Sequence, residues 1–179
     1  LRHLFLGEAP KADRAELAVL APVHRLFGAQ ARGQLGKRLT VTVDEVMRRG
    51  PQNPVIRETR SVKEALLTIT KARAGAASVV NQRGRLVGIF TDGDLRRHLE
   101  MNGNISSQSV LLKNVMTKRP ITIRAGRLAV EALGILNKRR IDEVPVVDKT
   151  GRPVGMVDIQ DLLKAGLVFS DLVTTVSPT

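Results

Sequence analysis

The stretch Asn81-Gln82-Arg83-Gly84-Arg85-Leu86-Val87-Gly88-Ile89-Phe90 decides the fold, because it returns 67 residues later as Asp148-Lys149-Thr150-Gly151-Arg152-Pro153-Val154-Gly155-Met156-Val157. In both places a glycine-containing turn separates two apolar runs, which is the pattern of a β-hairpin. The flanking residues repeat too, so residues 46–95 and 115–162 are two copies of one unit. A repeated unit of this length seldom buries its apolar face alone. We therefore expect the copies to pack together and to place their function at the joint.

The remaining matches extend the repeat in both directions. Val46-Met47 returns as Val115-Met116-Thr117, Ser61–Leu66 matches Leu128–Leu133, and Asp94-Leu95 matches Asp161-Leu162. Each copy reads as β-α-β-β-α behind a short helix. In the first copy these elements are a helix over 41–49, an extended segment at Val55-Ile56, a helix Val62–Ala72 with a Ser61/Glu64 capping box, strands Ala77–Val80 and Leu86–Phe90, and a helix Gly93–Glu100 capped by Thr91 or Asp92. In the second copy they are a helix Val110–Met116, a strand Ile121–Ile123, a helix Leu128–Asn137, strands Val144–Val147 and Pro153–Val157, and a helix from Asp158 or Ile159 to Lys164, with Gly166 as its stop.

The composition limits the class of protein. Hydrophobic residues make up 42% of the 179 residues, and with no Trp or Tyr and four Phe the core must be aliphatic. The absence of Cys excludes disulfides and thiolate metal sites, and the three His residues lack metal-ligand spacing. No apolar run approaches the roughly 18–20 residues of a membrane span. We expect a cytoplasmic protein without a catalytic array or a metal.

The net charge of +12 favours an anionic ligand such as a nucleotide, a sugar phosphate or a nucleic acid. A solvated basic surface explains the same number. Nucleic acid is the weakest of these alternatives, because the Lys and Arg residues are scattered and no aromatic residues are interleaved for base stacking.

The ends of the chain differ from the repeat. Residues 1–40 form an atypical leader and linker, with a short helix at Ala12–Leu20 and a flexible stretch at Gly28–Gly36. We expect the copies to occupy residues 41–104 and 105–167, followed by a polar tail over 168–179. The chain starts at Leu1 rather than Met, which we interpret as the start of an excerpt from a longer protein or of a processed product.

The hairpin followed by a capped helix resembles a known family. Gly88-Ile89-Phe90-Thr91-Asp92-Gly93-Asp94 matches the G-h-h-T/S-x-x-D signature of CBS domains. The two Val-Met motifs match the entry motif of that family, and Val144-Pro145-Val146-Val147-Asp148 matches its central strand. Two copies form a CBS pair, or Bateman module. The resemblance implies an α/β fold of two pseudo-symmetric β-α-β-β-α units packed against each other, and self-association as a homodimer.

A narrower resemblance covers Phe90–Arg97, Ala129–Leu133 and Asp161–Gly166, which are similar to the C-terminal part of arabinose 5-phosphate isomerases. Those enzymes serve Kdo and lipopolysaccharide biosynthesis and carry a sugar-isomerase (SIS) domain before the CBS pair. Forty residues cannot hold that domain. The resemblance therefore implies a non-catalytic regulatory fragment, with the SIS domain as its partner in the parent protein.

The resemblance also implies where a nucleotide would bind. In CBS pairs the signature Asp accepts hydrogen bonds from ribose hydroxyls and the Thr or Ser helps to hold a phosphate. The nucleotide site implied here comprises Thr91, Asp94, Val55, Ile56, Ala77, Ser78, Asp92, Arg96 and Arg97. Thr91 and Asp94 are equally consistent with a simple helix cap, and Arg96 and Arg97 with an exposed cationic face.

The second copy departs from the signature, since Asp158 stands where Thr or Ser is expected and would repel a phosphate. We expect the first site to be occupied and the second to be altered or empty. The weaker second site comprises Asp158, Asp161, Lys118, Arg119, Ile121, Val144 and Pro145, and Lys118, Arg119 and Arg140 are nearby cations that offset the extra charge.

The sequence therefore predicts a sensor of AMP, ATP or CMP-Kdo, in which the ligand shifts the packing of the two copies and an attached isomerase responds. Two alternatives remain at this point: a ligand-free oligomerisation module and a basic nucleic-acid-binding module.

Overall fold

The computed structural model describes residues 40–102 and 110–167, all of which belong to one compact unit, Arg38–Thr179. The predictions for the leader, for its helix at Ala12–Leu20 and for the tail lie outside the described residues. Within the described part of the chain, no helix is long and apolar enough to cross a membrane.

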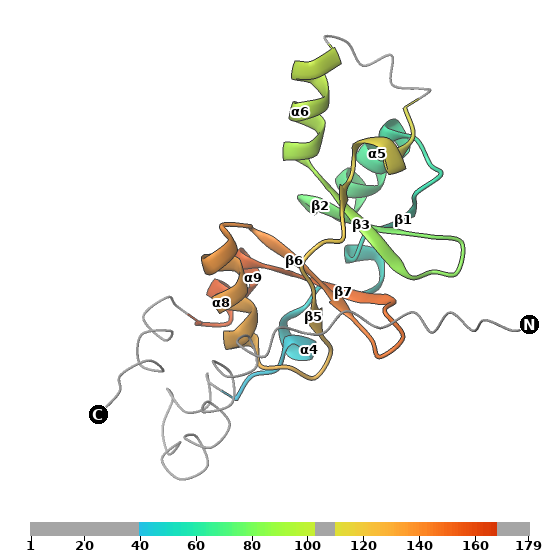
Figure 1. The fold of residues 1–179 in the computed structure, drawn as a ribbon. Coiled ribbons are helices and arrows are strands. Elements are labelled where there is room, and N and C mark those ends of the chain that lie inside the picture. The colour runs from blue at the N-terminus through green and yellow to red at the C-terminus, as the bar shows by residue number, and fades with distance from the viewer. Residues whose placement is uncertain (1–39, 103–109, 168–179) are drawn as a thin grey trace, which may run out of the picture. The chain divides into compact units, whose positions relative to one another are not determined.

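The element order confirms two β-α-β-β-α units (Figure 1). The first comprises β1 (Val55–Arg57), α5 (Val62–Ala72), β2 (Ala76–Val80), β3 (Leu86–Thr91) and α6 (Asp92–Asn102), preceded by α4 (Val43–Val46) and a 3-10 turn, Gly50–Gln52. The second comprises β5 (Ile123–Arg124), α8 (Ala129–Arg139), β6 (Glu143–Val147), β7 (Pro153–Asp158) and α9 (Ile159–Lys164), preceded by α7 (Leu112–Val115) and β4 (Thr117–Lys118).

Each unit forms one small sheet with the same pairing. The strand orders are β1-β2-β3-β4 and β5-β6-β7, and the first pair of each sheet is parallel while the hairpin pair is antiparallel. A parallel pair needs a crossover, and α5 and α8 supply it. The predicted hairpins are confirmed.

Helix α5 begins and ends where its sequence dictates. The Ser61 hydroxyl accepts from the Glu64 amide (3.2 Å), and the Glu64 carboxylate accepts from the Ser61 amide (2.8 Å), so the predicted capping box is present. Arg73, in the left-handed region at φ 51°, ends the helix. Ala65 and Ile69 lie on the buried face, at the four-residue spacing of one helix side.

Three predicted elements are wrong in extent. The helices expected over 41–49 and Val110–Met116 shorten to α4 and α7, and the strand expected from Ile121 begins at Ile123. The cause is backbone pairing that the repeat does not reveal. Arg48 exchanges two backbone hydrogen bonds with Met156 (2.8 and 3.1 Å), so the chain is extended there.

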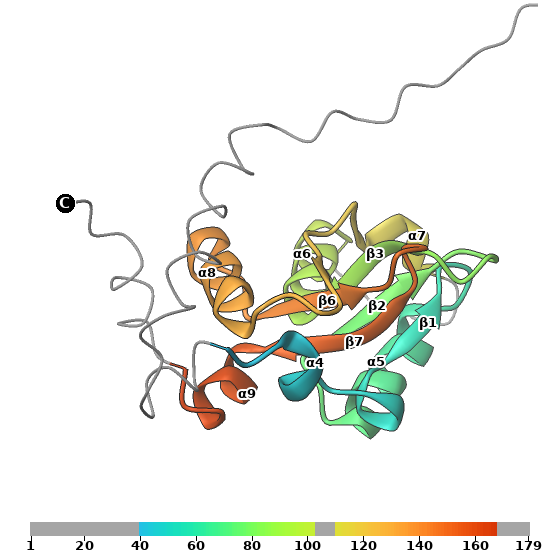
Figure 2. The same cartoon turned by 90° about the horizontal axis from the view of Figure 1, so that it is seen from below.

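The two Val-Met segments exchange places between the copies. The segment before the first copy pairs with the second, through bridges Thr42–Leu128 and Arg48–Met156, and α4 packs against α8 and β7. The segment before the second copy pairs with the first, since β4 extends the sheet beside β3 and α7 packs against α6 and β3 (Figure 2). Each unit is therefore completed by the other's leading segment.

In each unit a methionine of the Val-Met segment packs directly against a glycine of the opposite copy's hairpin. A Cβ built on Gly155 would overlap Met47 Sδ and lie 2.8 Å from Met47 Cγ, and one on Gly88 would overlap Met116 Sδ and lie 2.9 Å from Met116 Cγ. The signature glycines are thus required for close approach of the opposite Val-Met segment.

The core is aliphatic, as predicted, with Phe90 as a fully buried aromatic. The first unit's core includes Leu112 and Met116 from the exchanged segment. A smaller buried cluster of Ala76, Ile89 and Met156 joins β2 and β3 to β7, so the two sheets face each other.

Candidate functional site

The first signature cluster forms where β3 turns into α6. The Asp94 carboxylate accepts from the backbone amide and the hydroxyl of Thr91 (both 2.9 Å), and the Asp94 amide donates back to that hydroxyl (3.3 Å). This reciprocal pattern caps the N-terminus of an 11-residue helix, as the sequence suggested. It also buries the carboxylate, whose side chain is 1% exposed.

Two further groups reach Asp94 from its other side. The Thr117 hydroxyl, in the segment that leads into the second copy, donates to Asp94 Oδ1 (2.7 Å). Arg97 Nη2 forms an ion pair with the same oxygen. We call Thr91, Asp94, Arg97 and Thr117 the first cluster. On one carboxylate it joins Thr91 and Arg97 of the first copy to Thr117 of the segment that leads into the second copy.

The four acceptor positions of that carboxylate are all used in this arrangement. Three of its donors lie on Thr91 and Thr117, while the fourth lies on Arg97, whose side chain is 61% exposed. Thr117 is also exposed, so Asp94 is buried while two of its partners face solvent.

The other residues of the predicted nucleotide site have different surroundings. Ala77 and Ser78 lie in β2 opposite Phe90 and Ile89 and are fully buried, and Val55 and Ile56 pair with Ser78 and Val79. Among the described residues, the Ser78 hydroxyl has no hydrogen-bond partner. Asp92 and Arg96 are exposed on α6. Of the predicted set, side-chain hydrogen bonds join Thr91, Asp94 and Arg97.

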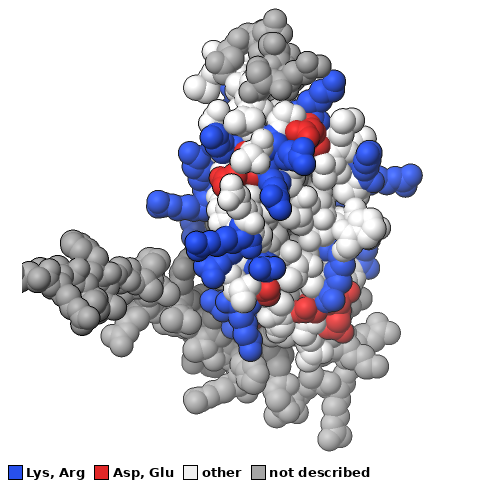
Figure 3. All heavy atoms as spheres, turned by 90° about the vertical axis from the view of Figure 1, so that its right-hand side faces the viewer, with Lys and Arg blue, Asp and Glu red and all other residues white. Residues whose placement is uncertain are grey.

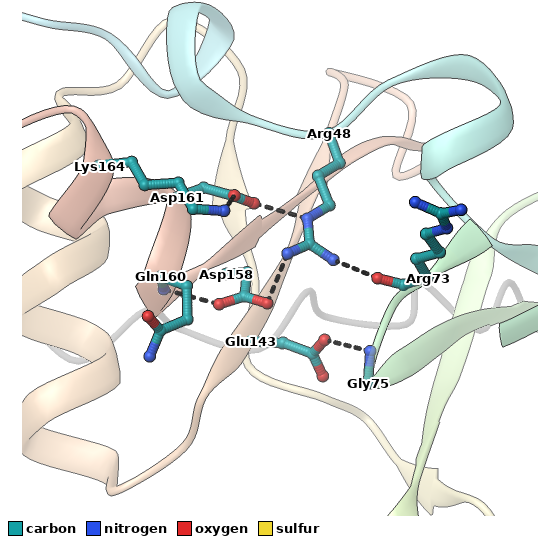
Figure 4. Close-up of polar contacts among 8 residues, drawn as sticks. All are labelled: Arg48, Arg73, Gly75, Glu143, Asp158, Gln160, Asp161 and Lys164. Atoms are coloured by element: carbon teal, nitrogen blue, oxygen red, sulfur yellow. Dashed lines mark hydrogen bonds and ion pairs between the residues drawn. The ribbon is translucent and has the colours of Figure 1, made fainter. Parts of the chain in front are cut away.

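The second signature cluster is built around Arg48 (Figure 4). Its Nε donates to Asp161 Oδ2 (2.6 Å) and its Nη2 to Asp158 Oδ2 (2.8 Å). Lys164 lies 3.5 Å from the other oxygen of Asp161. We call Arg48, Asp158, Asp161 and Lys164 the second cluster. The side chains of Arg48, Asp158 and Asp161 are 17%, 15% and 19% exposed, so the ion pairs are largely shielded from water.

Two hydrogen bonds at the second cluster reach the turn between α5 and β2 of the first copy. Arg48 Nη1 donates to the Arg73 carbonyl (3.2 Å), and Glu143 beside Asp158 accepts from the Gly75 amide (2.9 Å). Burial raises the pKa of Glu143 above its usual value despite that hydrogen bond, and the negative charge of Asp158 adds to the rise. Burial alone would lower the pKa of Arg48, but its bonds to the two aspartates outweigh this and raise it. Arg48 is therefore a permanent cation here.

The cation that offsets Asp158 is Arg48, not one of the three cations named from the sequence. Lys118 pairs with Gly88 in the first unit's sheet, Arg119 follows it at φ 51°, and Arg140 ends α8. The exchange of segments moves Lys118 and Arg119 to the side of the first unit. Of the remaining residues, Ile121 is 37% exposed, and Val144 and Pro145 are buried in β6.

A cavity of about 720 Å³ adjoins the second cluster. Its lining combines the first Val-Met segment, the end of α5 and α9, and includes Arg48, Lys71, Arg73, Asp161 and Lys164. The cavity therefore lies between the two copies, beside the second cluster rather than the first.

Thr117 and Arg48 were not identified from the sequence as site residues. A signal was available, because each follows the Met of its Val-Met motif and the two are therefore equivalent. What hid their role was the exchange of segments, which carries each of them to the signature of the other copy. Glu143 carried no signal, since it immediately precedes the segment that resembles the family.

The surface around the hairpin turns is basic. Figure 3 shows Lys and Arg side chains spread over this face with few Asp and Glu between them. A hollow of about 460 Å³ there is lined by Arg57, Arg83 and Arg152 among other residues. This surface accounts for part of the net charge found in the sequence.

Comparisons with known proteins agree with this geometry. The model of the CBS domain matches residues 43–101 and 112–168. Among curated relatives, arabinose 5-phosphate isomerase KdsD of Pseudomonas aeruginosa is 41% identical over 136 residues, which are 76% of this chain and 41% of that protein. KdsD of Escherichia coli K12 is 38% identical over the same length, covering 40% of that protein. The chain thus spans about two fifths of the length of these relatives.

Solved structures give the same fold. The CBS domain pair of protein MJ0100, in complex with 5′-methylthioadenosine and S-adenosyl-L-methionine, aligns with a TM-score of 0.62 at 25% identity, over 70% of this chain and 94% of that one. CBSX2 in complex with AMP aligns with a TM-score of 0.59 at 22% identity, over 70% and 96%. With its repeated hairpin units, its signature clusters and the family match over both copies, the chain belongs to the CBS domain family as a tandem pair.

Proposed function

We propose that this chain is a non-catalytic regulatory module that binds an adenine nucleotide or related nucleoside at the first cluster. The observation that carries the proposal is the Asp94 carboxylate, which is buried and yet bonded to both copies, through Thr91 and Thr117. A ribose that engaged this carboxylate would exchange hydrogen bonds with groups of both copies at once.

Charge supports the same ligand class. Arg97 is a charged and exposed partner of Asp94, and a guanidinium released from it is suited to a phosphate. The 11-residue helix α6 begins beside Thr91, and the N-terminus of a helix favours an anion. Two of the solved structures with this fold contain AMP or S-adenosyl-L-methionine.

The proposed mechanism is thermodynamic linkage. A ligand that binds one packing of the two copies more tightly shifts the equilibrium toward it, by no more than its difference in affinity for the two packings. The hydrogen bond between Asp94 and Thr117 joins one copy to the other. Replacing it by bonds to a ligand would therefore change the free energy with which the two copies pack together.

The partner we propose is a SIS domain of the arabinose 5-phosphate isomerase type, in a parent protein of Kdo and lipopolysaccharide biosynthesis. The support is the similarity to KdsD over both CBS copies. CMP-Kdo, as the nucleotide-sugar of such a pathway, is the second ligand to test. The proposal includes a cytoplasmic location.

The test is calorimetric titration of the purified chain with AMP, ATP, CMP, CMP-Kdo and S-adenosylmethionine. We expect one of them to bind near one per chain, and Asp94→Asn to weaken it at least tenfold. Asp148→Asn is the matched control, because Asp148 lies in the β6–β7 turn with bonds to Thr150 and Arg152. No binding at millimolar concentration, or equal loss in both variants, would refute the nucleotide assignment.

The alternative is a ligand-free module that joins two copies of the chain. It is favoured by exposed apolar side chains on the helices, among them Leu67 on α5 (53% exposed) and Met101 on α6 (82% exposed). Homodimerisation also accompanies the primary proposal, so only the ligand titration separates the two.

A further inference from the structure

The two signature clusters are built from equivalent positions that hold different residues. Thr91, Asp94 and Arg97 of the first correspond, 67 residues later, to Asp158, Asp161 and Lys164 of the second. Thr117 of the first corresponds to Arg48 of the second, one residue after each Val-Met motif. Relative to the first cluster, the second therefore has two changes of opposite charge. Asp158 stands in place of Thr91, Arg48 stands in place of Thr117, and the two side chains contact each other.

These two changes fill the second cluster from within. Thr117 gives Asp94 one hydroxyl, whereas Arg48 gives Nε to Asp161, Nη2 to Asp158 and Nη1 to the Arg73 carbonyl. The Arg48 guanidinium therefore bonds to both signature carboxylates and to the end of α5 at the same time. It takes one oxygen of Asp161, and Lys164 lies near the other.

Arg48 is also harder to displace than Arg97. Its side chain is 17% exposed against 61% for Arg97, and its backbone is fixed by two hydrogen bonds to Met156. If a ligand did remove it, Asp158, Asp161 and Glu143 would remain together as three neighbouring carboxylates, an arrangement that opposes a phosphate.

We propose that Arg48 is a built-in occupant of the second cluster, which confines nucleotide binding to the first cluster and sets the capacity at one nucleotide per chain. This inference rests on the proposed function for its ligand. It makes Arg48 and Asp158 specificity-determining residues, and the cavity beside them is not a second nucleotide site.

The test exchanges the two patterns and counts AMP by calorimetric titration. The variant Arg48→Thr/Asp158→Thr gives the second cluster the Thr residues that the first cluster has at the equivalent positions, and it leaves the net charge unchanged. The reciprocal variant Thr91→Asp/Thr117→Arg writes the second pattern into the first cluster. We expect one AMP for the native chain, two for the first variant and none for the reciprocal one. When Asp94→Asn is added, we expect no AMP for the otherwise native chain and one AMP for Arg48→Thr/Asp158→Thr.

A single conservative substitution provides a test that does not depend on the folding of the double variants. Asp161→Asn keeps Arg48 in place and should leave the affinity for AMP unchanged, within a factor of two. Two AMP per native chain, a tenfold loss in Asp161→Asn, or no added site in a cooperatively folded Arg48→Thr/Asp158→Thr would each overturn the inference.

The proposed function can fail separately. If the native chain binds no AMP but Arg48→Thr/Asp158→Thr binds one, the first cluster is not a nucleotide site while Arg48 is still the occupant of the second. If neither chain binds AMP, ATP, CMP, CMP-Kdo or S-adenosylmethionine, both proposals fall.

Discussion

Replacing Gly155 by Ala tests the contact that holds the exchanged segment in place. The new Cβ would overlap Met47 Sδ, lie 2.8 Å from Met47 Cγ and lie 3.0 Å from the Arg48 carbonyl oxygen. Met47 is 8% exposed and has little space to move, and Arg48 is tied to Met156 on both sides of its backbone. The segment must therefore shift away from β7.

The expected cost in the free energy of unfolding is about 1–3 kcal/mol, the usual range for overpacking a core. Met47→Ala alone should cost about 2–5 kcal/mol, since it removes a buried side chain. In the double variant the methyl group occupies part of the emptied space. Its total cost should therefore be less than the sum of the single costs, by about 1 kcal/mol or more.

The assay is urea unfolding followed by circular dichroism, with Gly93→Ala as the matched control. Gly93 lies in the first turn of α6, where a Cβ meets nothing closer than 3.4 Å, so the same chemical change should be neutral or stabilising there. Strictly additive costs for Gly155→Ala and Met47→Ala would refute the contact, as would a cost for Gly155→Ala no greater than that of the control.

Three further predictions concern individual groups. Burial raises the pKa of Glu143 in the folded chain above its usual value of 4.5. The folded chain therefore holds this proton at a pH where the unfolded chain has lost it, and the free energy of unfolding falls as the pH rises from the unfolded to the folded pKa. Glu143→Gln keeps an acceptor for the Gly75 amide; it should be more stable than the native chain at pH 7, with the difference vanishing below about pH 4 in thermal unfolding, and a larger difference at low pH would contradict the assignment. Ser61→Ala should lower the free energy of unfolding by about 0.5–2 kcal/mol through loss of the α5 cap, whereas no loss would mean that the Glu64 carboxylate alone suffices. Met101→Lys should shift a dimer toward monomer in sedimentation velocity, and an unchanged distribution would place the dimer contact elsewhere.

Local structure followed from the sequence wherever short-range chemistry decides it. The α5 boundaries were predicted to the residue, because Ser61 and Glu64 satisfy the first turn and the apolar residues recur at helical spacing. The hairpins followed from glycine turns between apolar runs, and these turn glycines lie at positive φ: Gly84 at 74° and Gly151 at 80°. The first cluster was predicted in part, since the spacing of Thr91 and Asp94 is that of a helix cap.

The sequence by itself determined the two-fold repeat, the α/β units, the aliphatic core and the asymmetry between Thr91 and Asp158. Only the tertiary structure decided which groups meet those residues. The exchange of the Val-Met segments rests on backbone pairing between residues as distant as Arg48 and Met156 and on a methionine above a glycine, and no local preference encodes such contacts. That exchange places Thr117 on Asp94 and Arg48 on Asp158 and Asp161, because side chains on one copy's leading segment can reach only the signature against which the segment packs.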